Sequence, residues 1–201
     1  MNRSHAKGFT LVELMITLGL AAILMAVAIP NMKDYMRNSR LTSAVNDVLH
    51  SLQVARTEAI KRQQGNVVVC GTANPNVAAP VCDYTNFNGW IVFQDLDNNW
   101  QVNGADVVIE RHGIVDASLT VKTDATDRII SFGPSGFENP NGARLNTRTI
   151  VVCDVRGITA IGTGSTARTV LITQTGRARA SAAWSDVNGL AKPTLVGGNC
   201  P

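Results

Sequence analysis

A long apolar run near the N-terminus constrains this chain more than any other feature of its sequence. The run extends from Phe9 to Ile29, 21 residues, and Glu13 is the single charged residue within it. A helix of that length spans the hydrocarbon core of a bilayer, which is about 30 Å thick. We therefore expect residues 9–29 to form a transmembrane helix.

A short basic leader precedes the apolar run. Residues 1–8 contain Arg3 and Lys7 and no acidic residue. Basic residues in front of an apolar segment favour retention of that end in the cytoplasm, although three further basic residues follow the run and weaken the signal. A cleaved signal peptide is the alternative, but the run is long for one and no A-x-A-like site follows it. We expect the part of the chain after residue 29 to be exported.

Export would place all the cysteines where oxidation is permitted. The four cysteines allow three disulfide pairings, and the sequence alone does not choose among them. We favour Cys70–Cys82, because it is local, and Cys153–Cys200, because it would fasten the C-terminal segment. A zinc site is the alternative, but there is no C-x-x-C spacing and the exported histidines are isolated. We therefore expect no metal.

The apolar pattern continues past Pro30, and a proline in a membrane helix can kink the helix rather than end it. Apolar residues then recur mostly at three- and four-residue intervals: Leu41, Val45, Val48, Leu52, Ala55 and Ile60. This spacing predicts an amphipathic helix over residues 30–64, ended by Gly65. Glu58 and Arg62 would add a favourable pair four residues apart on its polar face.

From Val67 onward the sequence changes to short β-branched runs separated by turn residues. Seven runs are typical of strands: 66–70, 89–95, 106–110, 119–123, 128–132, 148–155 and 168–176. The predicted fold class is α+β, with the long N-terminal helix packed on an antiparallel β-sheet domain over residues 65–180. Residues 181–201 are expected to form a C-terminal tail with little regular structure.

The residues that begin the apolar run, G-F-T-L-V-E-L from Gly8 to Leu14, resemble the processing signature of type IV pilins and type II secretion pseudopilins. The resemblance implies that a prepilin peptidase cuts after Gly8 and that the new amino terminus, Phe9, is methylated. Glu13 of one subunit would then neutralise the amine of a neighbour, because both charges are poorly solvated. Phe9, Glu13 and Pro30 are the residues expected to serve filament assembly. A plain membrane anchor with a stray acid is the alternative.

Three later segments are similar to the GspH/FimT group of minor pilins and pseudopilins: R-T-E-A-I-K-R-Q-Q-G-N-V-V-V, G-W-I-V-F-Q-D-L-D-N-N and the G-R-A-R of residues 176–179. Membership implies the pilin fold, and it implies other major and minor pilins, prepilin peptidase and the bacterial inner membrane as partners. The domain would lie in the periplasm on a single-pass anchor and enter a pilus after assembly. The FimT-like members of type IV pilus systems resemble this chain best.

Some FimT-like proteins are linked to DNA uptake through a G-R-x-R element, matched here by Gly176, Arg177 and Arg179. In an extended segment the two arginines point to the same face about 6.6–6.8 Å apart, and each could bind a backbone phosphate without reading a base. Lys192 would add a positive charge in the C-terminal tail. The alternatives are the solvated face of an edge strand and a type II secretion minor pseudopilin without a nucleic-acid role.

Other constellations favour plain structural interpretations. The segment D-L-D-N-N-W-Q-V-N-G-A-D carries Asp95, Asp97, Asn99 and Asp106 at calcium-loop spacing, but Trp100 replaces the required glycine and no glutamate ends it. We interpret it as a polar hairpin loop. The glycine-rich segment 162–167 is interpreted as a turn, because a strand rather than a helix follows. The histidines lack a nucleophile or carboxylate at recognisable spacing, so neither catalysis nor a cofactor is expected.

Overall fold

The computed structural model describes residues 8–83, 87, 89–113, 115–123, 129–139, 147–188 and 200. It divides into two compact units, Met1–Ser39 and Arg40–Pro201, which are described separately. The long helix α1, Leu11–Arg62, supplies almost all of the described part of the first unit and continues into the second.

The first unit consists of the apolar part of α1. Its large hydrophobic side chains are exposed, as shown by Leu11, Met15, Leu20 and Leu24, each more than half accessible to solvent. By length and composition this part of α1 qualifies as a membrane-crossing helix. The helix continues through Pro30 without ending.

The second half of α1 buries a regular apolar stripe in the domain. The buried residues of this stripe recur mostly at intervals of three and four residues: Leu41, Ala44, Val45, Val48, Leu52, Ala55 and Ala59. Ile60, which the sequence pattern assigned to the stripe, is instead 45% exposed, and Ala59 takes the buried position. The alternation of three and four reaches residue 59 after residue 55, so residue 60 falls outside the contact face.

The helix ends close to the expected residue. Its last residue is Arg62, and Glu58 accepts a hydrogen bond of 2.7 Å from Arg62 Nε, which confirms the predicted pair. Gly65 has a φ of +67°, and a Cβ at this position would lie 2.4 Å from the carbonyl oxygen of Asp95. Only glycine allows the chain to turn here against the neighbouring strand.

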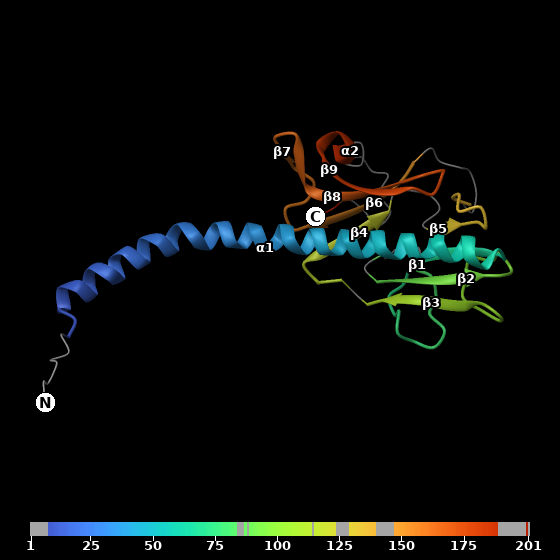
Figure 1. The fold of residues 1–201 in the computed structure, drawn as a ribbon, viewed down its shortest axis with the longest axis horizontal. Coiled ribbons are helices and arrows are strands. Elements are labelled where there is room, and N and C mark those ends of the chain that lie inside the picture. The colour runs from blue at the N-terminus through green and yellow to red at the C-terminus, as the bar shows by residue number, and fades with distance from the viewer. Residues whose placement is uncertain are drawn as a thin grey trace, which may run out of the picture. The chain divides into compact units, whose positions relative to one another are not determined.

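Two antiparallel sheets follow the helix (Figure 1). The first has the strand order β3-β2-β1-β5 and is built from β1 (Asn66–Gly71), β2 (Trp90–Asp95), β3 (Val107–His112) and β5 (Ile129–Phe132). The second has the order β4-β6-β8-β7, with β9 also pairing with β8. It is built from β4 (Leu119–Thr123), β6 (Thr147–Asp154), β7 (Ala160–Ile161), β8 (Gly164–Thr173) and β9 (Ala178–Ala183).

One hydrophobic core joins the helix to both sheets. It contains the buried stripe of α1, residues of the first sheet such as Trp90 and Phe132, and residues of the second such as Ile150 and Ile172. In Figure 1 the second half of α1 passes across the domain, with β2 and β3 to one side of it and β8 and β9 to the other. This arrangement confirms the predicted α+β class.

A buried ion pair also links the sheets. Glu138 follows β5 and Arg148 lies in β6, and each is only 2% exposed. Arg148 Nη1 donates to the carbonyl of Ile129 in β5, and the backbone N–H of Glu138 donates to the carbonyl of Gln174, the residue that follows β8. The pair therefore connects the edge of the first sheet to the second.

The first residues of the predicted C-terminal tail form regular secondary structure, which was not predicted from the sequence. All seven predicted strands are present, but the last, β8, begins at Gly164 and ends at Thr173. Residues 181–188, assigned from the sequence to a tail with little regular structure, complete β9 and form the short helix α2 (Trp184–Asn188). The small alanines and serine of β9 carry little strand signal, so its pairing with β8 depends on the neighbouring strand.

Candidate functional site

The start of α1 carries the residues of the predicted processing site. Gly8 and Phe9 lie just before the helix, and Phe9 is 79% exposed. The preceding residues, including His5, lie outside the described part of the chain.

Glu13 forms a capping box with Thr10. The backbone N–H of Glu13 donates to Thr10 Oγ1 at 3.2 Å, and the backbone N–H of Thr10 donates to Glu13 Oε2 at 3.4 Å. This reciprocal pair satisfies two of the unpaired donors at a helix N-terminus. The capping role of Glu13 was not predicted from the sequence. The T-x-x-E spacing of residues 10–13 is the signal that could have indicated this role.

The G-R-x-R element lies in a hairpin turn and not in one extended strand. β8 ends at Thr173 and β9 begins at Ala178, and the N–H of Gly176 donates to the carbonyl of Thr173 at 2.8 Å. The predicted strand over residues 168–176 therefore ends earlier, at Thr173, and the chain is not extended through the whole G-R-x-R element, because it reverses direction at the turn that contains Gly176.

Gly176 is required at this turn. Its φ is +75°, and a Cβ there would lie 2.1 Å from the carbonyl oxygen of Gly136 and 3.1 Å from Arg56 Nε. Arg56 Nε donates to the same carbonyl at 3.0 Å, and Arg56 Nη2 donates to Thr175 O at 3.2 Å. The glycine thus allows the turn to approach both the loop at Gly136 and the helix.

The two arginines of the element have different surroundings. Both side chains are exposed, but Arg179 Nη1 forms an ion pair with Asp186 of α2 at 3.3 Å. Asp186 also accepts a hydrogen bond from the Ser181 hydroxyl at 2.6 Å, and this bond, with the charge of Arg179, lowers the pKa of Asp186. The Arg177 side chain makes no hydrogen bond or ion pair with the residues that the structure describes.

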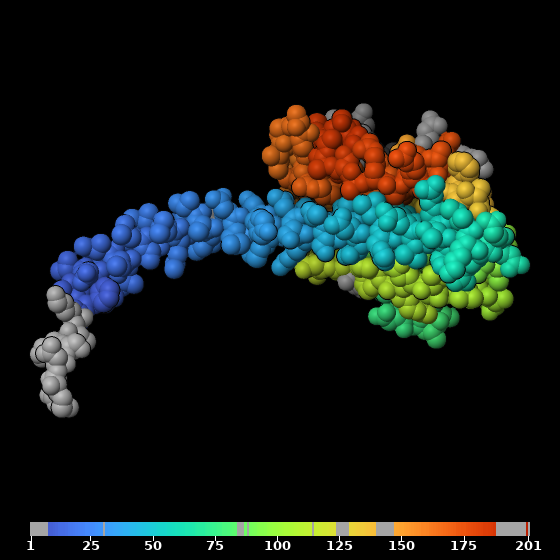
Figure 2. Space-filling view, viewed as in Figure 1, coloured from blue at the N-terminus to red at the C-terminus, as the bar shows by residue number. Residues whose placement is uncertain are grey.

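Arg177 faces a small hollow beside α1. The hollow has a volume of about 150 Å³ and is lined by Leu52, Gln53, Arg56, Gly176, Arg177 and Ala178; it is named here the Arg56 hollow. In Figure 2 the second half of α1 lies directly beside the orange and red region that includes β8 and β9. Arg56 follows Ala55 of the apolar stripe and belongs to no binding motif, so the sequence alone did not indicate it as a site residue. Lys192 lies outside the described residues.

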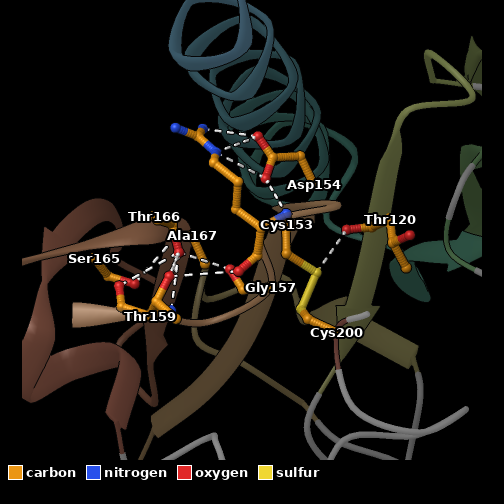
Figure 3. The surroundings of a disulfide bond; sticks show 10 residues. Thr120, Cys153, Asp154, Gly157, Thr159, Ser165, Thr166, Ala167 and Cys200 are labelled. Atoms are coloured by element: carbon orange, nitrogen blue, oxygen red, sulfur yellow. Dashed lines mark hydrogen bonds and ion pairs between the residues drawn. A yellow bond between two sulfur atoms is a disulfide. The ribbon is translucent and has the colours of Figure 1, made fainter. Parts of the chain in front are cut away.

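Two disulfides join the cysteines in the pairing favoured from the sequence. Cys70 bonds to Cys82 and Cys153 bonds to Cys200. Figure 3 shows Cys153 on β6 with its sulfur directed toward the carbonyl of Thr120, 3.5 Å away on the neighbouring strand. The second disulfide therefore attaches the chain at residue 200 to the centre of the second sheet.

The acidic hairpin segment brings three carboxylates together. Single oxygens of Asp95, Asp97 and Asp106 lie within 4.8 Å of one another. Asp95 is buried, which raises its pKa, and it accepts backbone hydrogen bonds from Asn99 and Trp100. These bonds shape the loop itself, in agreement with its interpretation as a polar hairpin loop.

The described histidines and the glycine-rich segment 162–167 agree with their plain structural interpretations. The ring of His112 stacks on Trp90 with centroids 3.8 Å apart, and its Nε2 lies 3.6 Å from Asp47. His50 is exposed on α1. Gly162 and Thr163 form a turn, and strand β8 starts at Gly164, so no helix follows the glycines.

Comparison with known proteins identifies the family. A family model described as type II transport protein GspH matches residues 44–176, more than half of the chain. A model of the prokaryotic N-terminal methylation motif matches residues 3–29.

Curated relatives match shorter parts of the chain. A fimbrial protein of Pseudomonas aeruginosa is 46% identical over 54 residues, 27% of this chain and 34% of that protein. Prepilin peptidase-dependent protein D of Escherichia coli (strain K12) is 34% identical over 76 residues, 37% of this chain and 49% of that protein. The chain thus spans about a third to a half of the length of these relatives.

A solved structure shares the fold. The type IV minor pilin FimU of Pseudomonas aeruginosa (strain PAO1) superposes with a TM-score of 0.51 at 22% identity, covering 75% of this chain and 94% of that one. The N-terminal motif, the long helix and the antiparallel domain agree with this likeness. The chain therefore belongs to the GspH family, within the GspH/FimT group of minor pilins and pseudopilins.

Proposed function

We propose that the protein is a minor type IV pilin that binds DNA without sequence preference during natural transformation. Prepilin peptidase removes the leader after Gly8, and the new terminus at Phe9 is methylated. The apolar part of α1 then anchors the subunit in the inner membrane, with the domain in the periplasm, until the subunit joins a pilus with major and minor pilins. The family is a structural group, and the proposal requires no catalytic step.

Assembly is supported by the match to the methylation motif over residues 3–29 and by the exposed apolar helix that follows it. Apolar side chains that are exposed along a membrane-length part of a helix require a lipid or protein environment. In a filament the amine at Phe9 and the carboxylate of Glu13 from a neighbouring subunit would both be buried, and pairing them avoids an uncompensated charge.

DNA binding is supported by one observation above others, the exposed Arg177 side chain without a partner among the described residues, next to the turn that Gly176 makes possible. An unpaired guanidinium at a protein surface binds phosphate oxygens through two parallel hydrogen bonds. Phosphate contacts carry no base information, so the predicted binding is independent of sequence and sensitive to salt.

The test is a binding titration with the full chain in an uncharged detergent. A fluorescent DNA duplex is titrated at several salt concentrations, and Arg177→Ala combined with Arg179→Ala is compared with the wild type. We expect the double variant to bind more weakly on every DNA sequence, with a salt slope smaller by about 0.9 for each phosphate that is no longer bound. Wild-type protein that binds no DNA at any salt concentration would exclude this function.

A type II secretion minor pseudopilin is the second candidate. The description of the matching family model, type II transport protein GspH, favours it. In that case the β8–β9 turn would contact other subunits, and the DNA titration would be negative while processing after Gly8 remains.

A further inference from the structure

Two arginine residues from distant parts of the chain line the Arg56 hollow. Arg56 lies on α1 and Arg177 follows the β8–β9 turn, and both line the same space of about 150 Å³. No acidic residue is among its lining residues. Neither arginine forms an ion pair within the part of the chain that the structure describes. The hollow is therefore positively charged and has no counter-ion of its own there.

Arg56 is held in a fixed orientation. Its Nε donates to Gly136 O at 3.0 Å and its Nη2 donates to Thr175 O at 3.2 Å. These two carbonyls fix the plane of the guanidinium, and its Nη1 has no partner among the described residues. A group fixed in this way loses little further entropy when it binds a ligand.

From this geometry we infer that the Arg56 hollow binds a backbone phosphate of DNA between Arg56 and Arg177, an inference that rests on the proposed function. The space is well above the ~10–15 Å³ that a single water needs, so a phosphate group can enter it. The exposed amide of Gln53, at the edge of the same space, supplies a further donor. Leu52 forms an apolar wall.

Within the G-R-x-R element, the residues then have different roles. Arg179 is paired with Asp186 at 3.3 Å, so part of its charge is already neutralised. Arg177 has no such partner, and the second cation of the phosphate site is Arg56, which the motif does not contain. Gly176 acts as a positioning residue, because only glycine lets the turn approach Gly136 and Arg56.

The experiment places a negative charge in the hollow without removing either arginine. Gln53→Glu converts an exposed amide in the lining into a carboxylate of nearly the same shape. Asn46→Asp is the matched control, because it makes the same change in net charge at an exposed position of α1 outside this lining. Position 46 lies seven residues away, about 10 Å along the helix, which is close to the Debye length of about 10 Å at 0.1 M salt.

Full-chain wild type, Q53E, N46D, R177A and R179A are titrated with a fluorescent DNA duplex in an uncharged detergent. We expect Q53E to weaken binding about tenfold, because a like charge then lies beside the phosphate, and N46D to weaken it less than about twofold because salt screens the charge. R177A should weaken binding about tenfold. R179A should weaken it by a smaller factor, because Arg179 is already paired with Asp186. Circular dichroism checks that each variant keeps the wild-type fold.

The outcomes distinguish failure of the phosphate site from failure of the proposed function. If the wild type binds DNA but Q53E and N46D behave alike, or R179A weakens binding as much as R177A, the phosphate lies elsewhere and only this inference falls. If the wild type binds no DNA, the proposed function and the inference fall together.

Discussion

At the scale of single residues, one acid has two distinct tasks. Glu13 accepts the N–H of Thr10 and so caps the helix, and in the proposed filament it also neutralises the amine of a neighbouring subunit. Capping needs only an acceptor oxygen, whereas neutralisation needs a full charge. The two tasks can therefore be separated by substitution.

Glu13→Gln keeps an acceptor for Thr10 but removes the charge, and Glu13→Ala removes both. We expect both variants to fail in pilus assembly, counted by electron microscopy, because the amine at Phe9 loses its counter-ion. Only Glu13→Ala should also lose helix stability, by about 0.5–1.5 kcal/mol, seen as faster exchange of the Thr10 amide, which loses its acceptor. Normal pili from the Gln variant would show that the charge is dispensable.

Gly176→Ala tests the second residue-scale requirement. The left-handed backbone and the clash with Gly136 O should together destabilise the domain by more than about 2 kcal/mol. Gly162→Ala is the control, because Gly162 has a φ of +60° but nothing lies within 4 Å of the place its Cβ would take, and it should cost only about 1 kcal/mol. Denaturant unfolding measures both; equal effects would mean that the close approach to Gly136 contributes nothing.

At the scale of elements, the two disulfides close loops of different length. Cys70 and Cys82 are 12 residues apart, whereas Cys153 and Cys200 are 47 residues apart. The longer loop loses more conformational freedom in the unfolded chain, so the second bond should stabilise the fold more. It also fastens residue 200 to a strand whose cysteine is fully buried.

Replacing both cysteines of each bond by serine tests this difference. The chain-entropy relation predicts a loss of about 3 kcal/mol for Cys70–Cys82 and about 4 kcal/mol for Cys153–Cys200. Denaturant titrations of the two double variants, under identical oxidising conditions, give the comparison. A larger loss from the shorter loop would contradict the entropic account.

The contact between β9 and α2 should depend on pH. The pKa of Asp186 is lowered, chiefly by the Ser181 hydroxyl and further by the charge of Arg179. A lowered folded-state pKa means that this stabilisation is fully present above the unfolded value of about 3.9 and is lost as the pH falls through the folded value. We expect residues 181–187 to open selectively in acid, measured by amide exchange. Ser181→Ala should shift this opening to higher pH, and an unchanged profile would contradict the assignment.

At the scale of the whole molecule, the helix and the two sheets share one core, and a buried ion pair joins the sheets. Arg148 lies in β6 of the second sheet and Glu138 follows β5 of the first, and each residue is 2% exposed. A buried pair contributes little net stability compared with well-packed apolar residues, but loss of one partner leaves a buried charge uncompensated. The pair therefore favours one arrangement of the two sheets.

Arg148→Met alone should destabilise the protein by about 3–5 kcal/mol, whereas Arg148→Met combined with Glu138→Met should recover most of that loss. Lys61→Met is a surface control: Lys61 is paired with Glu58 but its side chain is 73% exposed, and the change should cost less than about 1 kcal/mol. Denaturant unfolding of the full chain measures all three. A double variant as unstable as the single one would mean that the pair itself carries the stability.

The positions of most helices and strands of this protein could be predicted from local sequence patterns. The apolar run, the stripe along α1 and the seven β-branched runs each reflect a periodicity that one element imposes on its own residues, so their positions were predictable. The errors fall where that signal is weak. Ile60 lies one position from the true stripe, and the small residues of β9 adopt strand pairing only because β8 is beside them.

The sequence predicted Gly176, Arg177 and Arg179, but only the tertiary structure brought Arg56 to the candidate site. Arg56 meets the turn at Gly176 because α1 packs against the β8–β9 hairpin, and its partners Gly136 and Thr175 are 80 and 119 residues away in the chain. The pairing of Arg179 with Asp186 likewise depends on the unexpected helix α2. A local pattern encodes which element a residue belongs to, but the charge left unpaired at a surface depends on which distant elements the core brings together.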